Sequence, residues 1–303
     1  MSLLAQLARG SGARFGIADF KNDYGGSFPG LVAGKFVDLW EEGAPYNPLA
    51  LPDDSPRAIE KAIIELRDTV DVATKAFTRM GHRQLNKLRA ALEQAYEVGR
   101  AERRWPTLRT LDDLLDADLA GVIGDLTRHE IFKDGPPLGD AVAENIIFGL
   151  SQIPGNGLTT ILAAGFILSA LLLKLQGMSP VSNTIRYAVV VDEAHRVADF
   201  RAIDTMVREG RSKGLAVLLA TQQPGDLPDV VAANAQTKIC FRLPDATAAA
   251  AAARRLDPGD PTLPAQIRTL EVGEAFVSLG GATPRLLSMA QFWRDRAALD
   301  LPE

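Results

Sequence analysis

The chain has 303 residues, 47% of them hydrophobic and 23% charged, as in an ordinary globular protein of one large or two modest domains. Its formal net charge of −5 excludes an overall basic field for nucleic acid, so any contact with DNA has to be local. The single cysteine, Cys240, excludes an intrachain disulfide and fits a cytoplasmic protein. The three histidines lie far apart without cysteine partners, which argues against a zinc site.

The N-terminal part of the chain predicts a helix followed by a strand. Residues 1–9 have a helical pattern that ends at Gly10, and residues 13–20 predict a buried strand. The tip of this strand is polar and rich in turn residues, among them Asp19 and Lys21. A chain that opens in this order gives the expectation that a preceding strand and turn are missing.

Amphipathic helices are predicted over residues 55–104 and 107–126, where apolar side chains recur at spacings of three or four. We interpret residues 53–135 as a helical insertion between two parts of an α/β core, residues 1–52 and 136–303. The basic residues of this insertion either contact DNA phosphates or form a solvated helix face. They are His82, Arg83, Lys87, Arg89, Arg100, Arg103 and Arg104.

One uncharged stretch, residues 158–173, invites a membrane interpretation. It is shorter than the roughly 20 apolar residues that span a bilayer. It also lies between a strand predicted over residues 145–153 and a further apolar strand. We therefore expect a helix buried against a sheet, and no membrane span.

The chain is organised around a predicted strand–helix–strand unit of a buried parallel sheet. The apolar run that begins at Tyr187 ends in Asp192 and Glu193, and the run that begins at Leu215 is followed by Gln222. Ligands of parallel sheets bind at the carboxyl ends of the strands. Both runs place their polar residues at that end, so we expect them to face one site.

This pattern fits nucleotide hydrolysis. Asp192 can hold Mg²⁺ through water, and Glu193 can take a proton from the attacking water. Gln222 can orient that water or sense the γ-phosphate. The alternative is that the two carboxylates only cap the helix that follows.

The C-terminal part predicts further strands and a helix. Residues 238–243 are apolar and strand-like, and residues 246–256 form an alanine-rich helix. Residues 271–279 and 284–288 predict a final strand pair or hairpin.

With these motifs the chain resembles the HerA/FtsK superfamily of P-loop ATPases, most closely its HerA- and VirB4/TraG-like branch. The resemblance covers nearly the whole chain and depends on the order and spacing of five segments. They are IADFKNDYGG (17–26), YNPLAL (46–51), VVVDEAH (189–195), REGRSKG followed by AVLLATQQP (208–224), and NAQTKICFRL (234–243). The implied fold is a RecA-like P-loop NTPase: a mostly parallel sheet flanked by helices, here with a helical insertion.

The resemblance also implies residue roles. Asp192 would hold Mg²⁺ through water, Glu193 would be the general base, and Gln222 would be the γ-phosphate sensor. Arg211 would be an arginine finger that reaches the ATP of a neighbouring subunit. Arg208 and Arg242 are lesser finger candidates, and the cofactor-binding candidates are Asp192, Asp19, Lys21 and Arg242.

Members of the family are ring-forming, typically hexameric motors. The resemblance therefore implies ATP and Mg²⁺ as cofactors, DNA as a partner, a homo-oligomeric ring, and a nuclease or another protein as a further partner. A VirB4-like secretion ATPase is an alternative, because an ATPase core does not identify its cargo.

The phosphate-binding loop of the family, GxxGxGK[ST], is not found in this sequence. In the family, a helix similar to residues 1–9 directly follows that loop. We therefore expect a truncated form whose first strand and loop lie upstream, with little or no ATPase activity of its own. The alternative is a catalytically inactive scaffold or DNA-binding subunit of a ring.

Overall fold

The computed structural model describes residues 12–25, 34–75, 77, 79–155, 157–181 and 184–288. The helix expected over residues 1–9 lies outside this part of the chain. Two compact units make up the protein, residues 1–220 and residues 221–303. The boundary falls inside the range 136–303 that the sequence suggested as one part of the core.

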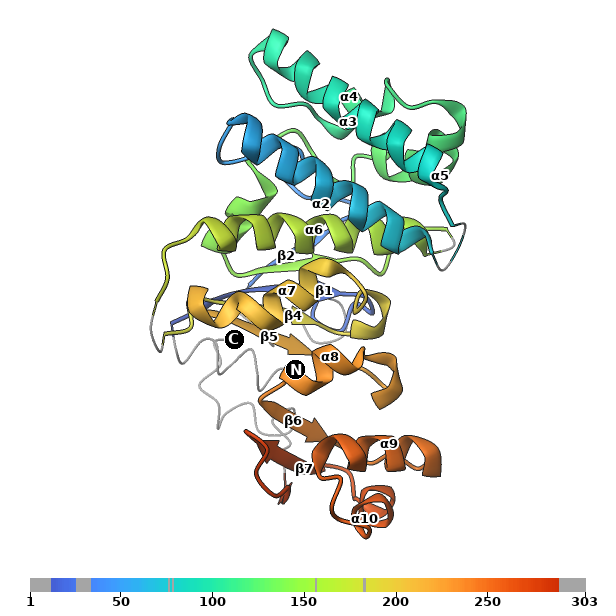
Figure 1. Cartoon of the computed structure of the whole chain (residues 1–303), viewed down its shortest axis with the longest axis vertical. Helices are drawn as coiled ribbons and strands as arrows, with labels where there is room; N and C mark the ends of the chain where they lie inside the picture. The colour runs from blue at the N-terminus through green and yellow to red at the C-terminus, as the bar shows by residue number, and fades with distance from the viewer. Residues whose placement is uncertain are drawn as a thin grey trace. The chain divides into compact units, whose positions relative to one another are not determined.

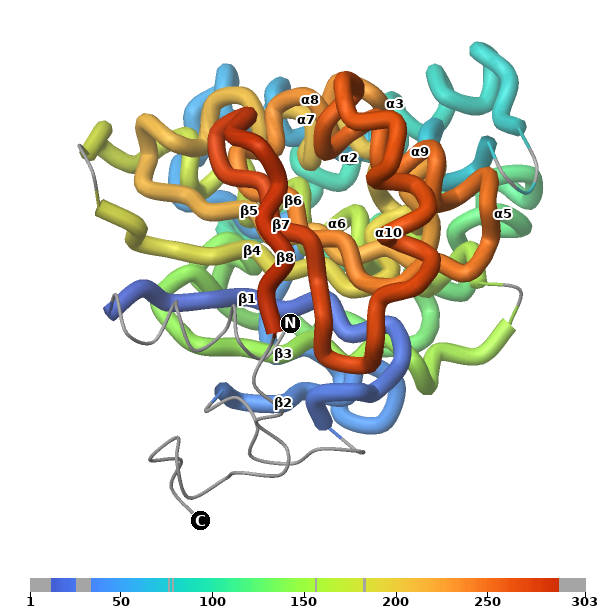
Figure 2. Tube along the Cα trace, turned by 90° about the horizontal axis from the view of Figure 1, so that it is seen from below, coloured from blue at the N-terminus to red at the C-terminus, as the bar shows by residue number. Residues whose placement is uncertain are grey.

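The first unit is built on a five-stranded parallel sheet in the order β2-β3-β1-β4-β5, which Figure 2 shows side by side. The strands are β1 (Arg14–Asp19), β2 (Lys35–Asp38), β3 (Ile146–Gly149), β4 (Tyr187–Val191) and β5 (Leu215–Leu219). β3 and β4 are buried along their whole length, as their apolar sequences require. Because every pair is parallel, all five carboxyl ends lie along one edge of the sheet.

The helices predicted over residues 55–104 and 107–126 are confirmed, and they lie in the sequence between β2 and β3. It contains α2 (Pro56–Thr74), α3 (His82–Glu102), α4 (Leu108–Asp112) and α5 (Ala117–Arg128), followed by the 3₁₀ helix η1 (Leu138–Ala143). Ser55 caps α2 by accepting the N–H of Ala58, and Asp116 caps α5 by accepting the N–H of Leu119.

The uncharged stretch forms α6 (Leu158–Gly177), which runs beside α2 in Figure 1 and also packs against η1 and α7 (Arg201–Glu209). Within the described residues, it is the one helix long and apolar enough to cross a membrane, and 78% of its most apolar window is buried inside the protein. Gly165 lets α2 and Phe200 approach, because a Cβ there would lie 2.5 Å from Thr69 Cγ2. The burial is that of a core helix, as the sequence predicted.

Between β4 and β5 the predicted helix is divided into three pieces. They are η2 (Ala194–Arg196), α7 (Arg201–Glu209) and η3 (Gly210–Lys213). Gly214 then turns the chain into β5 with a left-handed φ of 74°. A glycine fits here because other residues adopt this conformation at a cost.

The second unit contains a three-stranded antiparallel sheet, β6-β7-β8, with strands β6 (Thr237–Cys240), β7 (Glu274–Leu279) and β8 (Arg285–Ser288). The predicted final hairpin is therefore confirmed. The helical pieces are η4 (Pro224–Asp226), α8 (Asp229–Asn234), α9 (Ala246–Leu256) and α10 (Leu263–Thr269). Buried side chains of α9 and α10 form one apolar cluster with Phe276 of β7, which packs one face of the small sheet.

Candidate functional site

The end of β4 carries the acidic pair in a constrained conformation. Glu193 has a left-handed φ of 52° and is buried, while Asp192 is half-buried. The Asp192 carboxylate accepts the N–H of Glu193 at 3.0 Å. Neither η2 nor α7 begins with a side-chain cap, so the capping interpretation does not explain the pair. A non-glycine residue held at positive φ is the kind of local strain that functional sites store.

The end of the neighbouring strand β1 forms a tight polar turn. The carboxylate of Asp19, fully buried, accepts the backbone N–H groups of Lys21, Asp23 and Tyr24 at 3.2, 3.1 and 3.0 Å. Asn22, within the turn, has a left-handed φ of 62°. These hydrogen bonds show that Asp19 stabilises the turn. They involve no cofactor, so the cofactor-binding role of Asp19 stays a prediction.

An ion pair joins the two strand ends. The ammonium of Lys21 binds one carboxylate oxygen of Glu193, and His195 Nδ1 lies 3.7 Å from the other. The side chain of Lys21 is 42% exposed, whereas that of Glu193 is 8% exposed. The hydrogen bond to Glu193 raises the pKa of Lys21, so the ammonium stays charged. Both residues were predicted from the sequence as site residues, but their contact was not.

The electrostatics of this edge fit a divalent cation. Burial raises the pKa of Asp192, and the nearby charge of Asp23 raises it further. Burial and then the charge of Asp192 raise the pKa of the Tyr24 hydroxyl. A cation beside Asp192 would favour its charged form and oppose the effect of burial. Among the described residues no group of three or more His, Cys, Asp or Glu side chains could hold a metal ion.

The other predicted residues come from the segments before and after β5 and from the second unit. Gln222 follows β5 by three positions but belongs to the second unit, and Arg242 is exposed in the same unit. Arg211 is exposed in η3, before the amino end of β5, whereas the acidic pair lies at the carboxyl edge. Within one chain, Arg211 and Glu193 therefore lie at opposite ends of the sheet. A five-residue strand such as β5 separates these ends by about 17 Å. Arg208 is bound to Asp204 at 2.7 Å.

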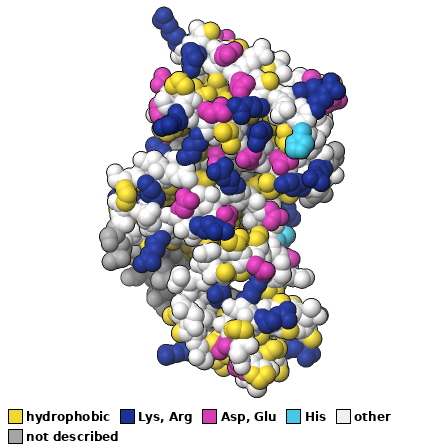
Figure 3. All heavy atoms as spheres, in the orientation of Figure 1, with side chains coloured by type: hydrophobic (Ala, Val, Ile, Leu, Met, Phe, Trp, Pro, Cys, Tyr) yellow, Lys and Arg dark blue, Asp and Glu magenta, His cyan; other side chains and the backbone are white. Residues whose placement is uncertain are grey.

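The basic residues of the helical segment are partly neutralised. Lys87 pairs with Asp116 and Asp118, Arg89 with Glu60 and Glu93, and Arg104 with Glu102. On the face shown in Figure 3, Lys and Arg side chains are interspersed with Asp and Glu side chains. This mixture is typical of a solvated surface and provides no single-sign stripe for a phosphate backbone.

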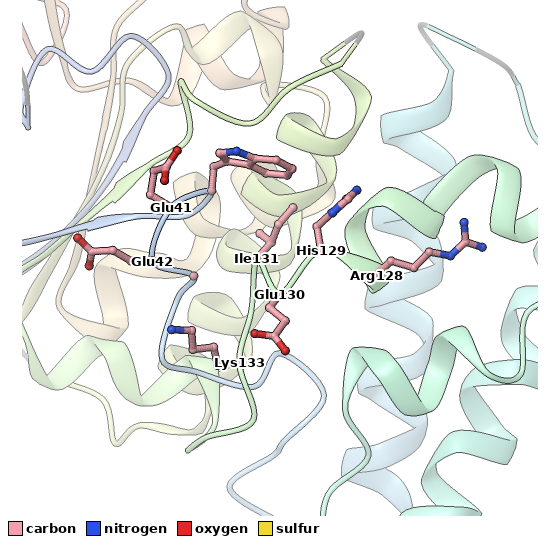
Figure 4. Close-up of a pocket in the computed structure, with 9 residues that line it drawn as sticks. Glu41, Glu42, Arg128, His129, Glu130, Ile131 and Lys133 are labelled. Atoms are coloured by element: carbon pink, nitrogen blue, oxygen red, sulfur yellow. The ribbon is translucent and has the colours of Figure 1, made fainter.

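A separate open pocket of about 540 Å³ lies between the loop after β2 and the segment after α5. Its wall includes the rings of Trp40 and His129, whose centroids are 5.1 Å apart. In Figure 4 the carboxylates of Glu41 and Glu42 point away from the guanidinium of Arg128. Because its charged groups do not converge, this pocket is a weaker candidate than the β1–β4 edge.

Comparison with known proteins finds solved structures of similar architecture. No protein-family model and no curated protein matches the sequence. Among solved structures, VirB4 of Thermoanaerobacter pseudethanolicus matches with a TM-score of 0.71 and 16% identity, over 95% of this chain and 84% of that one. The bacterial conjugative coupling protein TrwB, in its unbound form, matches with a TM-score of 0.66 and 14% identity, over 95% and 81%. TrwB in complex with ADP and Mg²⁺ gives 0.66 and 15%, over 95% and 82%.

The protein therefore has a P-loop NTPase fold: a parallel sheet flanked by helices. More particularly, it has the fold of the solved structures of TrwB and VirB4, which is the fold that the resemblance implied.

Proposed function

We propose that this chain is the core of a HerA/FtsK-type motor that couples ATP hydrolysis to the movement or processing of DNA in a ring. The observation that carries the proposal is the buried, conformationally constrained Glu193 beside Asp192, at the sheet edge where such folds bind ligands. The solved complexes of TrwB with ADP and Mg²⁺, and with non-hydrolysable analogues of ATP and GTP, support the binding of a nucleotide by this fold.

In this proposal Asp192 would hold Mg²⁺ through water, and Glu193 would accept a proton from the water that attacks the γ-phosphorus. The bond from that phosphorus to the bridging oxygen breaks, and its electron pair leaves with ADP. Bound Mg²⁺ supplies charge that stabilises the phosphate oxygens. Gln222 orients the water, and Arg211 acts on the ATP of a neighbouring subunit, in keeping with its place at the opposite edge of its own sheet.

The experiment compares this chain with the product of its reading frame extended upstream of Met1, wherever that frame is open. We expect little or no ATP turnover by residues 1–303. The extended protein should hydrolyse ATP and lose turnover by about 100-fold or more in Glu193→Gln. Robust turnover by residues 1–303, lost in the same variant, would show that this chain hydrolyses ATP without a GxxGxGK[ST] loop.

Two other outcomes select the alternatives. A closed upstream frame, with no nucleotide bound by the assembled protein, would support a scaffold or DNA-binding subunit. ATP turnover that double-stranded DNA leaves unchanged would favour a secretion ATPase of the VirB4 kind, because a DNA motor engages its track during the cycle.

A further inference from the structure

The ion pair between Lys21 and Glu193 joins two strand ends that are 172 residues apart in the sequence, the difference between positions 193 and 21. β1 and β4 are direct neighbours, with Ala18 paired to Val191. Beyond this last pair, the segment after each strand contains a residue with a left-handed φ: Asn22 after β1 and Glu193 after β4. The sheet and the two turns therefore hold the pair together.

The two partners differ in their freedom to move. Glu193 is fixed by its position two residues after the end of β4, by its backbone conformation and by burial. Lys21 reaches Glu193 from the rim through a flexible four-carbon stem, and its side chain is 42% exposed. The ammonium can thus leave towards solvent, whereas the carboxylate stays in place.

The pair also sets the state of the carboxylate. A buried carboxylate requires a compensating charge, and Lys21 supplies it. An ammonium bound to one of its oxygens favours the charged form of a carboxylate and so makes it a weaker acceptor for a proton from water. The same ammonium would interact favourably with a polyphosphate at this edge, because a polyphosphate carries several negative charges and a carboxylate carries one.

We propose that Lys21 is a positioning residue that exchanges partners: it binds Glu193 in the absence of nucleotide and a phosphate of the bound triphosphate in its presence. The exchange releases Glu193 for its role as a base only when substrate is present. This inference rests on the proposed function, and it goes beyond it by making the site self-inhibited when empty. A permanent structural ion pair is the competing explanation.

The experiment measures the affinity of residues 1–303 for tripolyphosphate by calorimetry. The variants are Glu193→Gln, Lys21→Met, Lys21→Arg and the double variant Lys21→Met/Glu193→Gln. Lys35→Met is the control, because Lys35 is exposed at the amino end of β2, away from this edge. The double variant removes both charges, so a failure to fold caused by an unpaired buried carboxylate does not affect it.

We expect Glu193→Gln to bind tripolyphosphate about three- to tenfold more tightly than the wild type, since its ammonium no longer has to leave a carboxylate. This gain should vanish in the double variant, which should bind as weakly as Lys21→Met. Lys21→Arg should retain most of the affinity, and Lys35→Met should match the wild type.

Three results would overturn the proposal: no gain in Glu193→Gln, a gain that persists without Lys21, or no binding by any form. The proposed function is judged separately, by ATP turnover of the protein extended upstream. If the tripolyphosphate pattern holds but the extended protein neither binds nor hydrolyses ATP, the partner exchange stands and the ATPase assignment fails.

Discussion

The carboxylate of Asp19 accepts the backbone N–H of Tyr24 at 3.0 Å, and this bond closes the turn that presents Lys21 to Glu193. The same carboxylate accepts two further amides and is fully buried. Asp19→Ala leaves all three donors without their acceptor, and we expect it to lower the free energy of unfolding by about 3 kcal/mol. Urea denaturation measures the loss.

Asp38 provides a matched control for Asp19. It also ends a strand of the same sheet and caps a turn, by accepting the amides of Trp40 and Glu41 at 2.9 and 3.1 Å. Its turn is more exposed, so Asp38→Ala should cost about 1 kcal/mol. Equal losses for the two variants would show that the Asp19 turn has no special stability.

Sequence reasoning worked where a single local signal decides the structure. The run at Tyr187–Val191 is apolar, rich in valine and followed by two carboxylates, and its predicted limits agree with β4. The helix at Ala246–Leu256 likewise begins after its cap, Asp245, and ends before Asp257. In both cases the boundary residues are unsuited to continue the element.

Tertiary contacts explain what sequence reasoning missed. The strand expected over residues 238–243 stops at Cys240, where its pairing with β7 ends, and Leu243 instead donates its N–H to Ile267 of α10. α10 is only 7 residues long, so its periodic signal is two buried positions, Leu263 and Ile267. The Lys21–Glu193 pair depends on the order of strands in the sheet, which local patterns do not specify.

Gly214 should resist substitution. Its φ is 74°, and a Cβ would lie 2.7 Å from the carbonyl oxygen of Thr184. Gly214→Ala should therefore destabilise the protein by about 2 kcal/mol through backbone strain and this clash. In contrast, Gly121→Ala in α5, where a Cβ meets no atom within 4 Å, should stabilise it by about 0.5 to 1 kcal/mol. Thermal unfolding of the two variants should shift in opposite directions, and a shared direction would contradict the structural reasoning.

The hydroxyl groups of Thr69 and Ser169 form a 2.8 Å hydrogen bond at the buried contact of α2 with α6. Thr69 also donates to the carbonyl oxygen of Glu65 at 2.8 Å, so Ser169 is the donor between the two hydroxyls. Thr69→Val should cost about 2 kcal/mol, because it leaves a buried donor unpaired.

The double variant Thr69→Val/Ser169→Ala should recover most of that loss, since neither partner then remains. Ser169→Ala alone serves as the reference, with an expected cost below about 1 kcal/mol. A double-mutant cycle from urea denaturation gives the coupling energy. A coupling near zero would mean that the two hydroxyls do not depend on each other.

Glu65 makes stability depend on pH. Its carboxylate is buried in α2, 3.2 Å from Arg201 of α7, with Asp68 nearby. Burial raises the pKa of Glu65 above its ordinary value of 4.5, and the charge of Arg201 only partly opposes this. The folded protein therefore holds the Glu65 proton more tightly than the unfolded chain does. This contribution to stability is complete below pH 4.5 and is lost as the pH rises through the folded-state pKa.

Glu65→Gln cannot titrate and should remove this contribution. Compared with the wild type, the variant should therefore gain stability as the pH is raised from 4 to 7. Urea denaturation of both proteins across this range measures the difference, and Asp54→Asn, which changes an exposed carboxylate, controls for general charge effects. If the stability difference between Glu65→Gln and the wild type stays constant with pH, or falls, then the attraction of Arg201 outweighs burial and the sign of the argument is wrong.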